Sequence, residues 1–296
     1  MKIVITGSLG HISKHIVKTL VAGKHDVVVV SSKPEKVLDI EALGAEAAIG
    51  SVEDVAFLTE TFTGAHAVYT MVPPNFAAQD WKGYNTQIGK NYAEAIKASG
   101  VKNVVNLSSI GAHMPEGAGP VSGLHHAEQA LSQLHNINLV HLRPGYFYYN
   151  LLNNIGMIKH AGIMGSNCGE NISLPMSATE DIAEVAAIEL QKMSHSGKNI
   201  AYLVSDERKT DEIAQVLGKA IGKPDLKWLN FKDEDSINGM IQSGIPAEAA
   251  KGLTEMGVAQ RTGAFYTDYR KHIPKTFGKT KLEEYAETFA AMYNHA

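Results

Sequence analysis

A short apolar run that breaks into a glycine turn and then into a helix pattern opens the sequence. Residues 2 to 20 read KIVITGSLGHISKHIVKTL. A strand that feeds a helix through such a turn leaves backbone N–H groups free at the helix N-terminus, where the helix dipole adds to their attraction for phosphate. Gly7 permits the tight turn, and Gly10 removes a side chain where a diphosphate must approach. The stretch predicts a βαβ unit that binds a nucleotide.

Ser13 stands where the dinucleotide-binding fingerprint often has a third glycine. That glycine serves mainly to let the helix pack closely on the strand. Because serine is small, the replacement makes the motif less specific without disabling it. A structural turn that binds no ligand is the alternative interpretation.

Strand-like and helix-like segments alternate through the first half of the chain. The strand-like runs are residues 2–6, 26–30, 45–49, 67–71, 103–107 and 139–142. The helix-like patterns between them are residues 11–22, 35–43, 55–61, 84–99 and 125–134. This alternation predicts βαβ units and a parallel sheet in an α/β fold. The runs VVVV and NVVNL are apolar on both faces, as buried parallel strands are.

The alternation loosens after residue 150. We expect a helix over 179–193 with Thr179 as its N-cap, a strand over 201–205 and a capped helix over 210–222. The rest reads as helical with Pro and Gly breaks, and residues 226–296 carry no motif that we can assign. We therefore predict a nucleotide-binding domain at 1–150 and a smaller lobe at 151–296 packed on it.

Composition excludes several classes of function. The 296 residues carry a formal net charge of −4, with scattered Lys and Arg, which argues against direct binding of nucleic acid. The single cysteine, Cys168, cannot form an internal disulfide. No run of about 20 apolar residues and no signal-peptide pattern is present. We therefore expect no membrane span and a cytoplasmic location.

The end of the second predicted strand bears on which dinucleotide is bound. NAD sites often place a carboxylate there, on the ribose 2′-OH. Here the strand ends in Ser31, Ser32 and Lys33. Two hydroxyls and an ammonium can bind a 2′-phosphate and do not repel it. We predict that NADP(H) is preferred and leave NAD(H) open, since an exposed loop lysine is also an ordinary feature.

Several segments in a fixed order resemble a known family. They are ITGSLGHISKHIVKTL, SSKPEKV, GSVED, YTMVPP, VKNVVNLSSIGAH, HHAEQAL, LRPGYFYYNLL, TEDIAEVAAIEL and DEIAQVLGKAIGKP. Together they resemble the NmrA-like group of atypical short-chain dehydrogenase/reductases over roughly residues 2 to 225. The resemblance implies a Rossmann-type, doubly wound parallel sheet with the dinucleotide across the carboxyl ends of its strands. It also implies a small C-terminal α/β lobe that closes a substrate cleft.

The resemblance implies cofactor contacts at specific positions. Relatives that use NADP(H) often have Arg where Ser32 stands, and often Asp near the adenine where Ser51 stands, so both positions depart from the pattern. Ser108 ends a strand at the cleft. The full set of implied cofactor residues is Gly7, Ser8, Leu9, Gly10, His11, Ile12, Ser31, Ser32, Lys33, Ser51, Met71, Val72, Pro73, Ser108, Pro144, Gly145 and Phe147.

The usual catalytic pair of the superfamily is missing. Short-chain dehydrogenases use Tyr-x-x-x-Lys, in which the lysine ammonium lowers the pKa of the tyrosine that acts as general acid. In the best-matching register, Ser122 replaces the tyrosine and His126 replaces the lysine. A serine hydroxyl without a strong base is a poor proton donor. We therefore do not expect ordinary alcohol dehydrogenase chemistry, nor epimerase chemistry that needs the same pair.

Two interpretations remain open. In the first, the protein is a reductase that passes a hydride from NADPH to an acceptor needing little proton assistance, such as a quinone or an azo compound. His126 and Tyr146 are then the candidate catalytic residues, and the aromatic run 146–149 with Phe76 and Trp81 offers a flat surface for the acceptor. In the second, the protein binds NADP(H) without turnover and reports redox state to a partner.

No metal is predicted. His125 and His126 are adjacent on a predicted helix, so their side chains point about 100° apart and cannot readily share one ion. A homodimer is left open.

Overall fold

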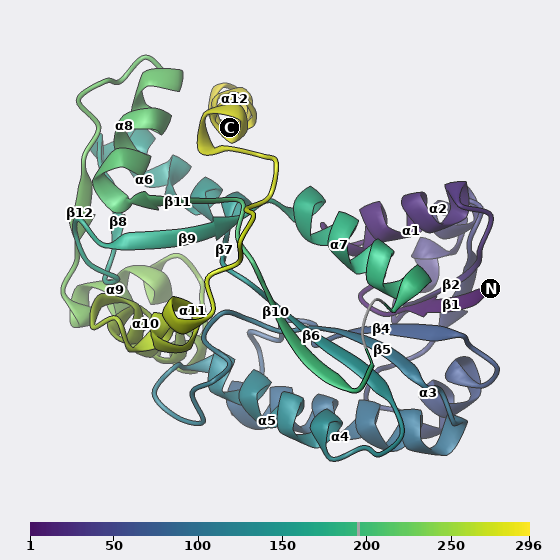
Figure 1. Ribbon diagram of the computed structural model, residues 1–296. Helices are drawn as coiled ribbons and strands as arrows, with labels where there is room; N and C mark the ends of the chain where they lie inside the picture. Colours follow the sequence, from purple (N-terminus) through teal and green to yellow (C-terminus); the bar gives the residue numbers. More distant parts are fainter. Residues whose placement is uncertain (194–195) are drawn as a thin grey trace.

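A seven-stranded parallel sheet forms the centre of the larger part of the molecule (Figure 1). The computed structural model describes residues 1–193 and 196–296. The strand order is β10-β6-β5-β4-β1-β2-β3. The strands are β1 (Lys2–Ile5), β2 (Asp26–Ser31), β3 (Glu46–Ile49), β4 (Ala67–Met71), β5 (Asn103–Leu107), β6 (Asn138–Pro144) and β10 (Lys198–Leu203). The order reverses between β1 and β4, which makes the sheet doubly wound, as the sequence predicted.

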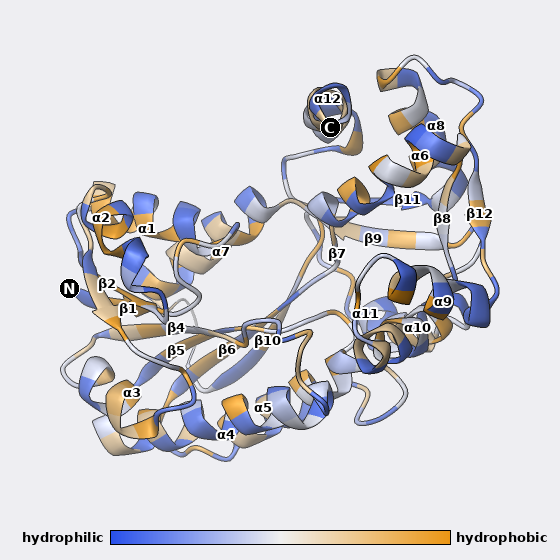
Figure 2. Ribbon diagram, turned by 180° about the vertical axis from the view of Figure 1, so that it is seen from behind, coloured by the Kyte–Doolittle hydropathy of each residue, from blue (hydrophilic) through white to orange (hydrophobic). Residues whose placement is uncertain are grey.

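Helices cover both faces of this sheet. The helices on one face are α1 (Ser13–Ala22), α2 (Val37–Glu41) and α7 (Thr179–Lys192), with a 3₁₀ turn η1 (Pro34–Lys36) before α2. Those on the other face are α3 (Val55–Phe62), α4 (Trp81–Ser99) and α5 (Pro120–Ser132). In Figure 2 hydrophobic colours gather on the inner strands, whereas the helices carry hydrophilic stripes toward solvent.

Several predicted boundaries were wrong. The strand expected over 201–205 is β10, Lys198–Leu203, and the starts of α4 and α5 and the N-cap of α7 also differ. α4 begins at Trp81 rather than at residue 84, because Asp80 caps it by accepting from the Gly83 N–H at 2.8 Å. α5 begins at Pro120 rather than at residue 125, since proline is favoured at the first helical position. Thr179 is the first residue of α7 and not its N-cap, which is Ala178 in an extended conformation.

The second part of the molecule is a mixed α/β lobe. Its strands form a three-stranded sheet, β11-β9-β7, and a two-stranded sheet, β12-β8. They are β7 (Tyr146–Phe147), β8 (Met164–Ser166), β9 (Ser173–Ser177), β11 (Asp206–Lys209) and β12 (Trp228–Asn230). Its helices are η2 (Tyr148–Asn154), α6 (Ile155–Ala161), α8 (Thr210–Ala220), α9 (Asp233–Gln242), α10 (Ala247–Arg261), η3 (Ala264–Tyr266), α11 (Thr267–Lys271) and α12 (Leu282–His295).

The two parts are interleaved along the chain. β10 pairs with β6 in the large sheet and α7 covers that sheet, although both lie beyond residue 150. The segment between α11 and α12 runs back along the junction, where the Gly278 N–H donates to the Val204 carbonyl at 2.8 Å (Figure 1). The division at residue 150 stays a prediction.

A buried ion pair in the large part of the molecule extends to the lobe through Asp268. The Arg143 guanidinium, on β6, donates to both carboxylate oxygens of Glu128, on α5, at 2.9 and 2.6 Å. It also donates to the Tyr202 hydroxyl at 2.9 Å and to Asp268, on α11, at 3.0 Å. Burial lowers the pKa of Arg143, but the hydrogen bonds and charge of Glu128 outweigh burial and hold that pKa above its ordinary value. The pair therefore stays charged inside the protein.

Removal of one partner of the Arg143–Glu128 pair should destabilise the protein strongly. We expect Glu128→Ala to lower the free energy of unfolding by about 3–5 kcal/mol, because it leaves the Arg143 charge buried beside Asp268 alone. Urea denaturation measures the change. Glu184→Ala is the matched control, since its exposed pair with Lys279 should contribute about 1 kcal/mol or less. Equal losses in the two variants would contradict the expectation.

Candidate dinucleotide-binding site

The turn after β1 presents backbone N–H groups that have no protein acceptor. Gly7 and Ser8 adopt positive φ angles of 89° and 54°, which turn the chain sharply toward α1. Within the described residues, the N–H groups of Leu9, His11, Ile12 and Ser13 donate to no protein atom. Ile12 and Ser13 are themselves buried. Unpartnered N–H groups at the N-terminus of a helix attract anions, so this end of α1 fits an anionic ligand.

Ser13 has a positive role in the turn. Its buried hydroxyl donates to the Thr6 carbonyl at 3.1 Å, which ties the first residue of α1 to the end of β1. A serine at the third fingerprint position is therefore compatible with close packing of helix on strand. Where a glycine would allow close packing by its lack of a side chain, Ser13 holds helix and strand together by this hydrogen bond.

Gly7 lies where the two halves of the sheet meet. A Cβ on Gly7 would come within 2.8 Å of the Met71 side chain, which projects from the end of β4. The Met71 N–H donates to the Thr6 hydroxyl at 3.0 Å, and the Met71 carbonyl accepts from the Tyr92 hydroxyl at 2.7 Å. β1 and β4 are the neighbours at which the strand order reverses, the position where α/β proteins bind nucleotides.

The end of β2 is joined to the same turn. The Ser8 hydroxyl donates to the buried Ser31 hydroxyl oxygen at 3.0 Å, and the Lys33 N–H donates to the same oxygen at 3.2 Å. Ser31 therefore keeps its own proton for a ligand. The side chains of Ser32 and Lys33 are exposed just beyond it. The contact of these residues with the adenosine ribose of a dinucleotide stays a prediction.

The ends of β5 and β6 place further predicted residues at the same edge of the sheet. The Ser108 hydroxyl is buried and has no hydrogen-bond partner in the part of the chain that the structure describes. Val72 and Pro73 are partly buried beyond β4, and Pro144 ends β6. A buried hydroxyl without a partner at this edge of the sheet fits a ligand that spans the carboxyl ends of the strands.

Two predicted positions have a structural explanation. Gly145 donates its N–H to the Leu203 carbonyl and to the Ser177 hydroxyl, and a Cβ there would lie 2.4 Å from the Pro175 carbonyl oxygen. Close approach of β9 thus requires this glycine. The exposed Ser51 accepts from the Glu53 N–H at 3.1 Å within its own turn.

The two positions matched by sequence with the superfamily's Tyr–Lys pair lie on α5. Ser122 is buried and its hydroxyl accepts from the Ala118 N–H at 3.1 Å. This bond holds the chain that leads into α5 against the first turn of the helix. His126 is half-buried and meets His125 edge-to-face, with ring centroids 5.2 Å apart. His125 itself bonds the Ala112 carbonyl at 2.9 Å. Among the described residues no cluster of three or more His, Cys, Asp or Glu side chains could hold a metal ion.

The aromatic run does not form one surface. Tyr146 and Phe147 form β7, whereas Tyr148 and Tyr149 begin the 3₁₀ helix η2, so successive rings of the run face different parts of the molecule. Tyr146 and Tyr148 pack into the core of the lobe, whereas Phe147 packs under the large sheet's helices and contacts Tyr149. Phe76 and Trp81 form a separate pair at the start of α4, with ring centroids 4.8 Å apart. The single flat platform expected from the sequence is thus divided among three places.

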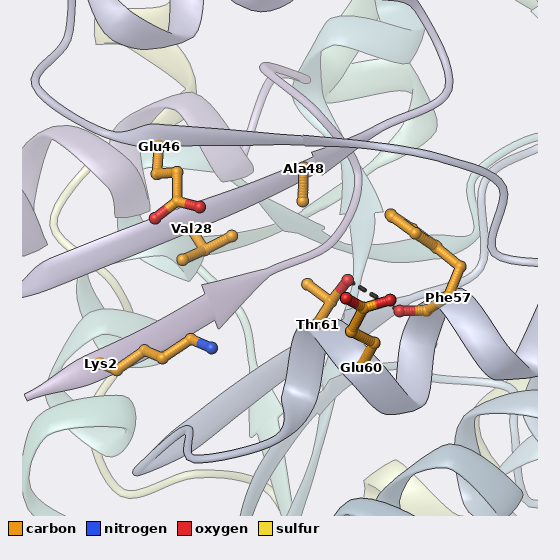
Figure 3. Close-up of a pocket in the computed structure, with 7 residues that line it drawn as sticks. All are labelled: Lys2, Val28, Glu46, Ala48, Phe57, Glu60 and Thr61. Carbon is orange, nitrogen blue, oxygen red and sulfur yellow. Dashed lines mark hydrogen bonds between the residues drawn. The ribbon is translucent and has the colours of Figure 1, made fainter.

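A separate pocket of about 330 Å³ lies at the opposite end of the sheet (Figure 3). Lys2 and Glu46 begin β1 and β3, so this pocket is near the amino ends of the strands and away from the glycine turn. Its lining residues are Lys2, Val28, Glu46, Ala48, Phe57, Glu60 and Thr61. It is therefore not part of the candidate dinucleotide site.

Comparison with known proteins decides the family. The NmrA-like family model matches residues 1–287. The chain belongs to the NmrA-like family. Among curated proteins it is similar to an NAD(P)H azoreductase of Xenophilus azovorans, with 24% identity over 99% of this chain and 100% of that protein.

Solved structures share the NmrA-like fold. One is an NADPH-dependent quinone oxidoreductase of Escherichia coli in complex with NADPH, with a TM-score of 0.81, 22% identity and coverage of 97% of this chain and 99% of that chain. Another is the triphenylmethane reductase of a Citrobacter species in complex with NADP(H), with a TM-score of 0.79, 19% identity and coverage of 98% and 100%. These likenesses establish the Rossmann-type architecture of this family member.

Sequence reasoning missed several residues that build the site of this NmrA-like protein. Tyr92 gave no signal, because a tyrosine on an amphipathic helix is ordinary core. Thr6 was assigned to the strand, although a threonine directly before a glycine turn can cap the neighbouring strand. Tyr149 was grouped with the acceptor surface, yet its ring stacks on His11 of the glycine turn.

Substitution of Gly10 by alanine should weaken NADPH binding without destabilising the fold. A Cβ there would meet only the Gly7 carbonyl oxygen, at 3.2 Å, and Gly10 has no positive φ. We expect Gly10→Ala to leave the melting temperature within a few degrees of the wild type but to weaken NADPH binding by at least about ten-fold, since the methyl stands where the diphosphate approaches.

The matched control is Gly156→Ala, a helical position with no atom within 4 Å of the added Cβ. Isothermal titration calorimetry measures the binding. Unchanged NADPH affinity in Gly10→Ala would exclude this turn as the diphosphate site.

Proposed function

We propose that this chain is an NAD(P)H-dependent oxidoreductase that prefers NADPH and passes a hydride to a quinone-like or similar small acceptor. The observation that carries the proposal is the set of four unpartnered N–H groups at the start of α1, with the orphaned Ser108 hydroxyl at the same edge of the sheet. The named relatives are an azoreductase, a quinone oxidoreductase and a dye reductase that use NAD(P)H or are complexed with it. This pattern favours an enzyme over a sensor.

The residues at positions 122 and 126 support the choice of acceptor. Ser122 carries a weakly acidic hydroxyl, and His126 rather than a lysine follows four residues later, so no lysine ammonium assists proton donation from that hydroxyl. A ketone needs strong proton donation as its carbonyl becomes an alkoxide. A quinone or an azo bond accepts a hydride more readily, and one further proton completes its two-electron reduction. An acceptor of this kind suits a site without the Tyr–Lys pair.

NADPH, when bound, supplies the hydride. We assign the free amides and Ser31 to holding its phosphates and ribose, and Lys33 to the 2′-phosphate. His126 holds the proton that the reduced acceptor takes up. Burial raises the pKa of Tyr146 above its ordinary value, so its phenol stays protonated and can donate a hydrogen bond that orients the acceptor.

The structure bears on the cellular location only through its helices. No helix in the described residues is both long and apolar enough to cross a bilayer. The cytoplasmic location and the homodimer left open by the sequence stay predictions.

Turnover with a small acceptor panel tests the function. We expect NADPH absorbance to fall when the purified protein is mixed with benzoquinones, naphthoquinones or an azo dye. His126→Gln should lower kcat by about ten-fold without changing the KM for NADPH, because only proton delivery is lost. His125→Gln is the matched control. Tight NADPH binding without oxidation of NADPH by any acceptor would favour the sensor instead.

The preference for NADP(H) should depend on Lys33. We expect Lys33→Ala to weaken NADP(H) binding by about five- to ten-fold and NAD(H) binding by less than about two-fold, since only NADP(H) carries the 2′-phosphate. Lys36→Ala, three residues on and already paired with Asp39, is the control. Equal losses for both dinucleotides would remove Lys33 from this role.

A further inference from the structure

Three aromatic rings stack in a row from the glycine turn to the lobe. The His11 and Tyr149 ring centroids are 4.5 Å apart with an interplanar angle of 23°. The Tyr149 and Phe147 centroids are 5.3 Å apart at 29°. Both distances lie in the range of favourable aromatic contacts. The row therefore links a residue of the candidate diphosphate site to the first residues of the lobe.

The far end of this row is firmly held. Phe147 packs against the hydrophobic core between the large sheet and its helices α1 and α7. Tyr148 points the other way, where its hydroxyl donates to the Thr280 carbonyl at 3.2 Å and its ring stacks on Tyr285 at 4.9 Å. Because both neighbours are anchored, the backbone at Tyr149 has little freedom to move. Tyr149 is thus a fixed support for the ring that it touches.

The near end of the row is a side chain that would otherwise be free. His11 is exposed, and its backbone N–H is one of the four without an acceptor in the described residues. An exposed side chain on a loop samples several rotamers, and ordering it on binding costs affinity. A stacked partner removes part of that cost before the ligand arrives.

We propose that Tyr149 is a positioning residue for the dinucleotide. It stacks on His11 and holds the imidazole beside the free amides, where an N–H of the ring can donate to the diphosphate. This inference rests on the proposed function, since it deepens the role of the same site. It moves Tyr149 from the acceptor surface, where the sequence placed it, to the cofactor.

A double-mutant cycle tests the proposal. Binding of NADPH, and of 2′-phospho-ADP-ribose, which has the diphosphate but no nicotinamide, is measured for the wild type, Tyr149→Ala, His11→Ala and the double variant. We expect Tyr149→Ala to weaken both ligands by roughly three- to ten-fold, the scale of one aromatic contact. In the His11→Ala background the same change should have less than about a two-fold effect, because Tyr149 acts through His11.

Two variants control for a merely structural effect. Tyr149→Phe keeps the ring and should restore wild-type affinity, whereas Tyr293→Ala removes a tyrosine ring from α12, elsewhere on the lobe, and should leave affinity unchanged. The KM for the acceptor should not change in Tyr149→Ala.

The outcomes separate this inference from the function. If the wild type binds no dinucleotide, both fail. If the wild type binds NADPH, three results would overturn the positioning role and leave the proposed function standing. Tyr149→Ala could bind NADPH as tightly as the wild type, or it could change only the KM for the acceptor. The third result is that Tyr149→Ala weakens NADPH binding by the same factor with His11 and with His11→Ala.

Discussion

The backbone at the junction of β1 and α1 is the constraint on which the rest of the site depends. Positive φ angles at Gly7 and Ser8 turn the chain so that four consecutive or near-consecutive N–H groups leave the protein's own hydrogen-bond network. Because the described residues offer those N–H groups no acceptor, the groups are free to bind an anionic ligand. The hydroxyl of Ser13 and the side chain of Met71 hold this arrangement from two sides.

The neighbouring strands are tied to this turn by side chains rather than by the sheet alone. Ser31 links β2 to Ser8, and Thr6 links β4 to β1. Each bond places a strand end, and the groups that follow it, at a fixed position relative to the amides. The lobe also contacts the large sheet at a second place, where Arg143 on β6 donates to Asp268 on α11. This contact involves none of the residues that hold the glycine turn, so variants at the two places can be distinguished.

The fold was predictable because its signals are local and repeated. Apolar strands such as residues 103–107 and the glycine turn each specify their own structure, and their alternation specifies a parallel sheet. The contribution of β10 was not predictable, since a strand beyond residue 150 carries no mark of which sheet it joins. The start of α5 at Pro120 was missed because its first residues read as a loop.

The site was predictable where it is made of backbone and not where it is made of side-chain pairs. Glycines at positions 7 and 10 indicate the free amides, but nothing in the sequence shows that the Ser122 hydroxyl accepts from the Ala118 N–H. The run at 146–149 shows the same limit. Its composition is visible, yet whether each ring faces the lobe or the sheet depends on the change from strand to 3₁₀ helix at Tyr148 and on partners distant in sequence.

Backbone amide NMR during titration with NADPH tests the central claim most directly. If the free N–H groups bind the diphosphate, the amide resonances of Leu9, His11, Ile12 and Ser13 will shift together, saturate with the same dissociation constant and become protected from hydrogen exchange. Binding of NADPH that shifts other amides but leaves these four unchanged would contradict the account.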